Sequence, residues 1–106
     1  MNIIWSESAL DVFSATADYV QENFGDIACA KFIQKVKHTA DILSCNPGIG
    51  IIEPRLSKAS IKYRSINADG INRIVYFVEE DCIHIVDFWN MRRNPKTLAN
   101  RVLKNT

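Results

Sequence analysis

Apolar residues recur at alternating steps of three and four along the amino-terminal half of the chain, and a single glycine, Gly25, interrupts them. This period is that of α-helices that each bury one stripe. Gly25 suits the end of the first helix, and Ser6 and Asp26 suit the N-cap of each. Two helices joined by one glycine-containing corner are expected to pack as an antiparallel hairpin. The positions predicted to be buried are Leu10, Phe13, Ala17, Val20 and Phe24 in the first helix and Cys29, Ile33, Val36, Ala40 and Leu43 in the second.

The other elements up to residue 89 are predicted to be strands. Residues 3–5 form an apolar run that is too short for a helix and stops at Ser6, so a strand is expected there. Residues 46–60 hold two prolines and two glycines without any period, which indicates an irregular connection of a length that is often functional. Three more strands, with turn residues between them, are expected at residues 60–66, 71–79 and 82–89.

A short helix is predicted to end the chain. Asn94 suits an N-cap and Pro95 the first helical turn, while Leu98 and Val102 are spaced to face inward. The predicted order of elements is therefore β-α-α-β-β-β-α. The length of 106 residues fits a single domain over residues 1–106.

Composition narrows the class of protein. The chain is 47% hydrophobic and 24% charged, as is ordinary for a soluble globular protein, and its formal net charge is only +1. A nucleic-acid partner would therefore have to be held by a local basic cluster. Cys29, Cys45 and Cys82 fit neither a CxxC pair nor a disulfide framework, so a cytoplasmic location is expected. No leader segment and no apolar run long enough to span a bilayer is found, so no membrane partner is expected.

Cations interrupt the predicted strands, most notably Arg73 within the apolar stretch INRIVYFV. With a four-residue turn at residues 67–70, Arg64 lies directly across from Arg73. With a two-residue turn, the partner changes but both arginines stay on one face, and Lys62 alternates onto the face of Arg64. Like charges in neighbouring positions are unfavourable, so the cluster of Lys62, Arg64 and Arg73 is expected to face solvent or an anion such as phosphate.

Asp87 offers Arg73 a second role. A three-residue turn at residues 79–81 places Asp87 opposite Arg73 as a structural ion pair, whereas a two-residue turn points Asp87 to the other face. The spacing favours neither the ion pair nor the anion site. Arg92 and Arg93 follow the last strand and are expected near the cluster if that strand neighbours the one before it, although adjacent arginines at a strand end are usually solvated.

Other catalytic chemistry finds little support in the sequence. His38 and His84 lack the nearby Cys, His or carboxylate side chains that a metal site requires, so no metal or other cofactor is expected. Cys82 would lie beside His84 on one face of a strand without a third partner, which argues against a nucleophilic role. Glu53 could act as a base, but a lone carboxylate in a loop is expected to be solvated.

Two segments resemble the RelE/ParE superfamily of toxins from bacterial type II toxin–antitoxin modules, the plasmid stabilisation type. IIWSESALDVFSATADYV is similar to the family's first strand and helix, with Trp5, Ser6, Ala9 and Asp11 at matching positions. GINRIVYFVEEDCIHIVDFWNMRRNP is similar to the family's carboxy-terminal signature of a glycine, an arginine-bearing apolar strand, an acidic turn, a further apolar strand and two arginines. The resemblance spans nearly the whole chain and agrees with the predicted order of elements.

The resemblance implies an α+β fold in which a helical hairpin covers one face of a mainly antiparallel sheet. It also implies a growth-inhibiting toxin that a cognate antitoxin protein wraps and blocks. In the ParE-like branch the target is DNA gyrase. In the RelE-like branch the protein is a metal-independent endoribonuclease that cleaves messenger RNA on the ribosome.

The resemblance also suggests catalytic roles for the cations, should the protein be a nuclease. Lys62, Arg64 and Arg73 match positions at which the RNA-cleaving branch carries basic residues that stabilise the transition state. Arg92 or Arg93 matches a further arginine of that branch.

Residues that the RNA-cleaving branch uses for proton transfer are missing from this sequence, and their absence guides the choice between the ParE-like and RelE-like branches. Residues 94–106 contain neither the tyrosine nor the histidine that RNA-cleaving members use for proton transfer, and Asn90 stands where many relatives have a histidine. The sequence therefore favours a ParE-like inhibitor of gyrase. The alternatives are a RelE-like endoribonuclease and an inactive relative that only binds antitoxin, in which Arg73 is locked to Asp87.

Overall fold

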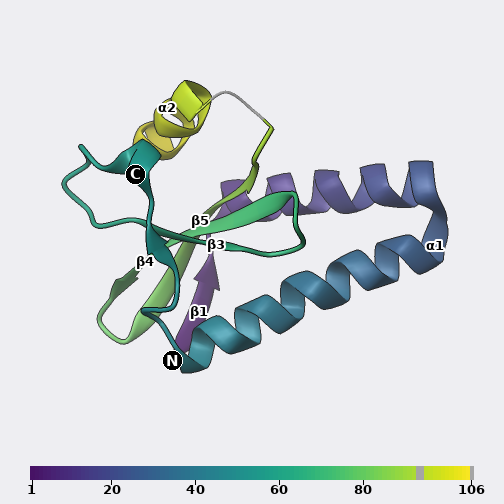
Figure 1. Ribbon diagram of the computed structural model, residues 1–106, viewed down its shortest axis with the longest axis horizontal. Helices are drawn as coiled ribbons and strands as arrows, with labels where there is room; N and C mark the ends of the chain where they lie inside the picture. The colour runs from purple at the N-terminus through teal and green to yellow at the C-terminus, as the bar shows by residue number, and fades with distance from the viewer. Residues whose placement is uncertain (93–94, 106) are drawn as a thin grey trace.

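The computed structural model describes residues 1–92 and 95–105, with side chains described for residues 1–92 and 97–103. The predicted order of helices and strands is confirmed in an α+β molecule, with a short strand and a 3-10 helix added (Figure 1). The elements are β1 (Asn2–Trp5), α1 (Glu7–Cys45), β2 (Ile51–Ile52), the 3-10 helix η1 (Pro54–Leu56), β3 (Arg64–Asn67), β4 (Asn72–Glu79), β5 (Cys82–Asn90) and α2 (Pro95–Asn105).

The strands form one five-stranded mixed sheet in the order β1-β5-β4-β3-β2. β1 runs parallel to β5, with Ile3 beside Ile83, and the other neighbours are antiparallel. A parallel pair needs a long crossover, which α1 and the strands that follow it provide. The first and last strands of the sequence therefore lie side by side (Figure 1).

α1 is a helical hairpin whose two arms meet at Gly25 (Figure 1). Ser6 is the N-cap of the first arm, and its hydroxyl accepts a 3.0 Å hydrogen bond from the Ala9 amide. Gly25 has φ 89° and ψ 176°, a conformation in which a side chain would be strained, so glycine is required at the corner. The predicted hairpin is confirmed, and the carboxylate of Asp26 accepts a hydrogen bond from Gln21 across the corner.

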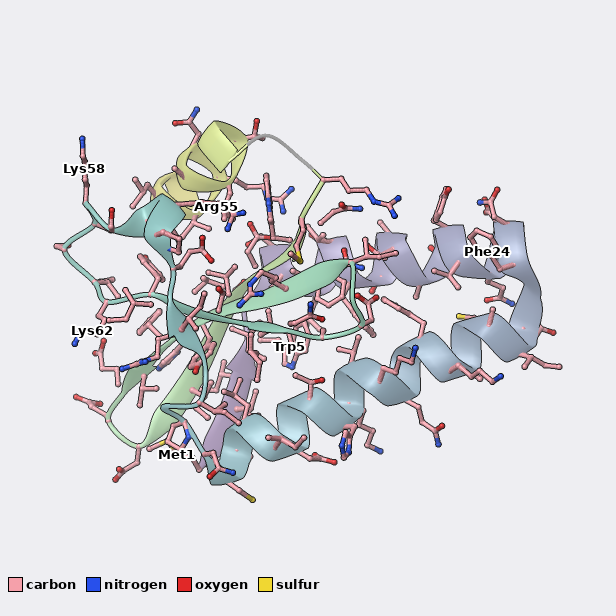
Figure 2. The ribbon with its side chains drawn as sticks, viewed as in Figure 1. Met1, Trp5, Phe24, Arg55, Lys58 and Lys62 are labelled. Atoms are coloured by element: carbon pink, nitrogen blue, oxygen red, sulfur yellow. The ribbon has the colours of Figure 1, made fainter. Side chains whose placement is uncertain are left out.

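The buried stripe of the hairpin differs in part from the prediction. Leu10, Phe24 and Ile33 are 46%, 67% and 42% exposed, although the period predicted burial for all three. The hairpin extends beyond the sheet, and Figure 2 shows Phe24 near the tip, where no strand covers it. The positions buried instead of the predicted ones are Ala9, Phe32 and Thr39.

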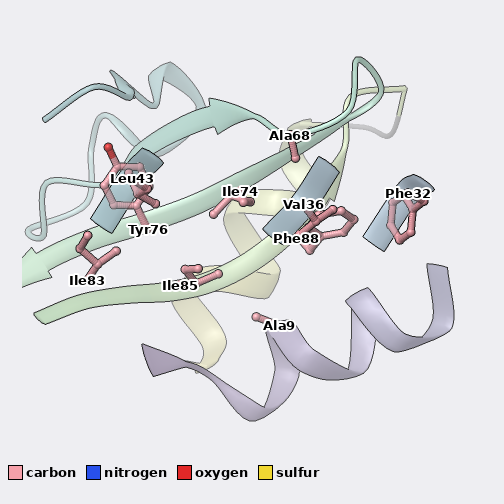
Figure 3. Close-up of a cluster of buried hydrophobic side chains, with 10 residues drawn as sticks. All are labelled: Ala9, Phe32, Val36, Leu43, Ala68, Ile74, Tyr76, Ile83, Ile85 and Phe88. Atoms are coloured by element: carbon pink, nitrogen blue, oxygen red, sulfur yellow. The ribbon is translucent and has the colours of Figure 1, made fainter. Parts of the chain in front are cut away.

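The two faces of the sheet have separate cores. The hairpin face, covered by α1, packs side chains such as Tyr76 and Phe88 against Val36 and Leu43 (Figure 3). The opposite face, here called the α2 face, packs Trp89 and its neighbours against α2 and η1. Leu98 and Val102 are 0% and 2% exposed in this second core, so the predicted inward face of α2 is confirmed.

Residues 46–60 are more ordered than the predicted irregular connection. β2 pairs with β3, and η1 follows it. The hydroxyl of Tyr76 on β4 donates to the Pro47 carbonyl at 2.8 Å and accepts from the Gly50 amide at 3.0 Å. A Cβ at Gly50 would lie 2.5 Å from that hydroxyl, so only glycine fits. Contacts to distant strands order this segment, and they leave no local period in the sequence.

Candidate functional site

The turn between β3 and β4 places Arg64 and Arg73 on opposite faces of the sheet. Arg73 pairs with Asn67, and Arg64 pairs with Tyr76. Ala68 donates to the Asn72 carbonyl, which leaves a three-residue turn at residues 69–71. The prediction that Lys62, Arg64 and Arg73 share one face is therefore wrong. Both predicted turns had an even number of residues, and an odd number reverses the face of every following side chain.

Arg73 lies on the α2 face, within a network of polar side chains. Its Nε donates to Ser65 Oγ at 3.0 Å, and its Nη2 donates to the Ser65 carbonyl at 3.1 Å. Ser65 Oγ in turn donates to Glu53 Oε2 at 2.6 Å. The second oxygen of Glu53 accepts from Arg55 Nη1 at 2.8 Å. One buried carboxylate thus holds Arg55 directly and Arg73 through a hydroxyl.

Glu53 is ionised despite its burial. It is 1% exposed, so the prediction of a solvated loop carboxylate is wrong. Burial raises the pKa of Glu53, but the hydrogen bonds from Ser65 and from the side chain and backbone of Arg55, together with the charge of Arg55, outweigh burial and lower it. The carboxylate therefore carries its negative charge at neutral pH and is committed to these partners rather than poised to accept a proton from a substrate.

Lys62 and Arg64 form a separate basic site at the other face. They border a surface hollow of about 320 Å³ together with Pro47, Gly48 and Val78. Arg64 Nη1 donates to the Gly50 carbonyl at 2.8 Å, which fixes the guanidinium against the loop. Lys62 lies at the end of the molecule opposite the tip of the hairpin (Figure 2).

The hydroxyl of Tyr76 lies under this basic site. Burial raises the pKa of Tyr76, while the Gly50 hydrogen bond and the charge of Arg64 lower it by a smaller amount. The hydroxyl is therefore neutral at physiological pH and serves as a bridge between Pro47 and Gly50.

Asp87 pairs with Arg101 rather than with Arg73. The turn between β4 and β5 has two residues, Glu80 and Asp81, which by itself would point Asp87 away from Arg73. A bulge at Val86 then shifts the register, so Asp87 pairs with Val75 and faces α2. Arg101 Nε and Nη2 bind the Asp87 carboxylate at 2.9 and 2.6 Å.

The Asp87–Arg101 contact corrects the predicted lock between Asp87 and Arg73. No ion pair joins these two residues within the described part of the chain. The guanidinium of Arg101 also lies 4.8 Å from the centre of the Trp89 ring. Arg101 thus fastens α2 to β5 through both a carboxylate and an aromatic ring.

The remaining predicted site residues are only partly described. Arg92 is exposed after β5, and its amide donates to Asn90 Oδ1 at 2.8 Å. Arg93 and the predicted N-cap Asn94 lie outside the described residues. Within residues 1–92 and 97–103, no three His, Cys, Asp or Glu side chains are grouped in a way that could hold a metal ion.

The family of the chain follows from its match to a known sequence pattern. Residues 3–95 match the family described as ParE toxin of type II toxin-antitoxin system, parDE. The chain belongs to the ParE toxin family. No curated protein matches this ParE-family toxin in sequence. In the described residues, no helix is both long enough and apolar enough to cross a membrane.

Solved structures share the fold of this ParE-family toxin. The chromosomal ParDE toxin–antitoxin system of P. aeruginosa matches with a TM-score of 0.67 and 19% identity, over 85% of this chain and 95% of that one. The YoeB dimer of Staphylococcus aureus matches with a TM-score of 0.55 and 23% identity, over 83% and 93%. The heterotetrameric YoeB–YefM toxin–antitoxin complex of that organism gives 0.53 and 24%, with the same coverage.

Several residues of the site could not be identified from local patterns in this ParE-family toxin. Arg55 and Glu53 lie in a segment without a period, so nothing indicated their contact with β3. Ser65 did carry a signal, because it continues the alternation that buries Tyr63. Arg101 is three residues after the buried Leu98 and one before the buried Val102, so it lies at the edge of the buried stripe of α2. This spacing could have indicated that Arg101 contacts the sheet.

Proposed function

We propose that this ParE-family toxin arrests bacterial growth by inhibiting DNA gyrase and that a cognate antitoxin neutralises it. The match over residues 3–95 is to the ParE family. Membership of the ParE-like branch implies gyrase as the target. The alternative is ribosome-dependent cleavage of messenger RNA by the cations of the sheet.

The register of β3 and β4 is the observation that favours gyrase inhibition over RNA cleavage. A metal-independent nuclease needs several cations directed at one phosphate, because preorganised charge stabilises the transition state. Here Arg64 lies on the hairpin face and Arg73 on the α2 face. Arg73 also donates to Ser65, so part of its hydrogen-bonding capacity is satisfied within the protein.

RNA cleavage also needs a side chain that transfers a proton, and the His84 and Tyr63 side chains are poorly placed for this role. His84 stacks on Phe77, with ring centres 4.7 Å apart, and does not border the Lys62 hollow. Tyr63 lies on the α2 face but is only 2% exposed. Tyr63 belongs to the same buried cluster as side chains of η1 and α2, and its hydroxyl is buried, so it is not available to a substrate in the folded protein.

The proposed antitoxin partner is supported by relatives that share the fold. The P. aeruginosa structure is of a ParDE toxin–antitoxin system, and the YoeB–YefM structure is of a toxin–antitoxin heterotetramer. We infer that this chain likewise assembles with an antitoxin. Co-expression with the antitoxin encoded beside it is expected to restore growth.

The function is tested by two readouts from one induction experiment. The intact chain and Arg73→Ala are induced in a bacterium, and plasmid supercoiling and messenger RNA 5′ ends are measured shortly afterwards. The proposal predicts relaxed plasmid and uncut messages with both proteins. Purified protein is then expected to inhibit supercoiling by purified gyrase.

Other outcomes identify the alternatives. New 5′ ends inside translated regions that disappear with Arg73→Ala would establish the endoribonuclease and refute gyrase inhibition. Growth arrest with uncut messages and unaffected gyrase would also refute the proposal. An absence of any growth effect would identify an inactive relative.

A further inference from the structure

The charges of the helical hairpin are divided between its two arms. Residues 7–24 contain four acidic side chains and no lysine or arginine, whereas residues 26–45 contain three lysines and two aspartates, Asp26 and Asp41. The net charge of +1 hides this division. The stretch of the second arm between these two aspartates is therefore locally positive on a nearly neutral molecule.

The basic side chains of the second arm lie together in space. Lys31, Lys35 and His38 follow the steps of four and three that place side chains on one helix face. All three are exposed. A surface hollow of about 660 Å³ is bordered by Lys31, Gln34, Lys35, Lys37, His38 and Asp41. These six residues are called the basic patch below.

The lysines of the basic patch are not neutralised by the protein. Within the described residues, none of the three lysines forms an ion pair, and neither does Asp41. Lys31 and Lys35 are four residues apart on the helix, and like charges at this spacing destabilise a helix. The two lysines therefore do not contribute to the stability of the fold. An anionic partner would relieve this repulsion.

We propose that the basic patch binds the phosphate backbone of duplex DNA. From Lys31 to His38 the helix rises roughly 10 Å, at about 1.5 Å per residue. Duplex DNA carries one charge per roughly 1.7 Å of its axis, so a stripe of this length faces several phosphates. An exposed helix that carries ammonium groups on flexible side chains suits contacts that hold the backbone without reading sequence.

The border of the patch favours a duplex over a single strand. Proteins that bind single-stranded nucleic acid combine cations with aromatic rings on which bases stack. No Phe, Tyr or Trp borders the basic patch. The choice of DNA rests on the proposed function, because gyrase acts on duplex DNA. By binding that DNA, the basic patch would keep the toxin close to gyrase.

Binding is measured without gyrase, by fluorescence anisotropy with a short random-sequence DNA duplex. We expect the intact chain to bind weakly, with a Kd on the order of micromolar at roughly 50 mM salt, and more weakly as salt rises. Lys31→Gln/Lys35→Gln should raise the Kd about tenfold and reduce the slope of log Kd against log salt by about 2, since each phosphate contact contributes about 0.9. Glutamine and lysine have similar helix propensities, so α1 should stay folded, as circular dichroism would check.

Lys58→Gln is the matched control, and it is compared with the single variant Lys35→Gln. It removes the same charge from an exposed lysine on the other side of the molecule from the hairpin tip. It should leave the Kd within about twofold of that of the intact chain, since non-specific binding depends on phosphate contacts.

Three results would overturn the proposal. They are no binding at low salt, an equal loss of binding in Lys35→Gln and Lys58→Gln, and tighter binding of a single-stranded RNA of the same length. Because gyrase is absent, loss of DNA binding here and loss of gyrase inhibition in the supercoiling assay are separate results.

Discussion

At the scale of the residue, Glu53 organises the polar contacts of the α2 face. It lies in a connection that the sequence describes only as irregular, yet it is 1% exposed and accepts from three donors in Arg55 and Ser65. A buried carboxylate is favourable only when its lone pairs are occupied by such donors. Glu53 therefore ties η1 to β3 and, through Ser65, holds Arg73.

Glu53→Gln is expected to change how the stability of the protein depends on acid. In the unfolded chain Glu53 takes up a proton near its ordinary pKa of 4.5, whereas in the folded chain its pKa is lower. The ionised carboxylate therefore contributes stability above about pH 4.5, and this contribution is lost as the pH falls through the folded pKa. The variant should be less stable at neutral pH by on the order of 1–3 kcal/mol and should lose less stability on acidification.

Urea unfolding between about pH 7 and pH 3 measures this difference. Glu79→Gln is the matched control, because it removes an exposed carboxylate that has no ion pair in the described structure. The assignment to Glu53 would be contradicted if both variants gave the same profile against pH.

Gly50→Ala is expected to destabilise the protein, whereas Gly48→Ala is not. A Cβ at Gly50 would lie 2.5 Å from Tyr76 Oη and 2.8 Å from the Ser65 carbonyl, and the carbonyl belongs to a strand that cannot easily move. Overpacking of this kind costs roughly 1–3 kcal/mol. A Cβ at Gly48 meets nothing within 4 Å, so its effect should stay within about 0.5 kcal/mol. Chemical unfolding of both variants measures the contrast, and equal stabilities would refute the close approach at Gly50.

At the scale of the element, the sequence predicts which helices and strands exist better than it predicts which way they face. The hairpin, the strands β3, β4 and β5 and the final helix follow from periods of 3.6 and 2, which are local properties of the chain, although β3 begins only at Arg64. The face of the sheet on which Arg73 lies depends instead on whether the turn between β3 and β4 has an even or an odd number of residues. The observed turn, residues 69–71, has three. One residue more or fewer reverses the parity of the whole strand.

The bulge at Val86 shows the same limit of local patterns. It turns Val86 and Asp87 to one face of the sheet, although successive strand residues normally alternate. No residue type in CIHIVDFW marks this position, so the pairing of Asp87 with Arg101 could be found only from the folded structure. The candidate cations were identifiable by type, but their grouping was not.

The contact between Asp87 and Arg101 is expected to stabilise the docking of α2. Asp87 is 3% exposed in its side chain and Arg101 is 25% exposed, and two hydrogen bonds join them. Asp87→Ala should cost about 2–3 kcal/mol, because it leaves a half-buried guanidinium without its carboxylate. Arg101→Ala should cost a similar amount, and the double variant should lose less than the sum.

A double-mutant cycle by urea unfolding gives the coupling energy of this pair. The comparison cycle combines Asp87→Ala with Arg73→Ala, which lie diagonally across β4 and β5 on one face without an ion pair, so its coupling energy should be smaller than that of Asp87 with Arg101. A larger coupling of Asp87 to Arg73 than to Arg101 would contradict the observed ion pair.

At the scale of the whole molecule, the division of charge between the two arms has a consequence for binding. The arms pack against each other where Cys29 Sγ donates to the Ala17 carbonyl at 3.5 Å, so the acidic arm lies beside the basic patch. Charges within a Debye length of about 10 Å at 0.1 M salt act on each other's partners. The acidic arm should therefore weaken the attraction of the patch for phosphate and also keep non-specific binding modest.

Asp18→Asn/Glu22→Gln is expected to tighten the binding of duplex DNA by roughly twofold to fivefold at low salt, because both acidic side chains are exposed on the first arm. The gain should shrink as salt rises above about 0.1 M, since the effect acts across solvent rather than through a contact. Glu79→Gln/Glu80→Gln changes the net charge equally at the β4–β5 turn, away from the hairpin, and should give a smaller gain. An equal gain from both double variants would show that only net charge matters. That result would remove the reason to assign DNA binding to one arm of α1, whereas a gain confined to the hairpin variant would show that the phosphates approach that arm.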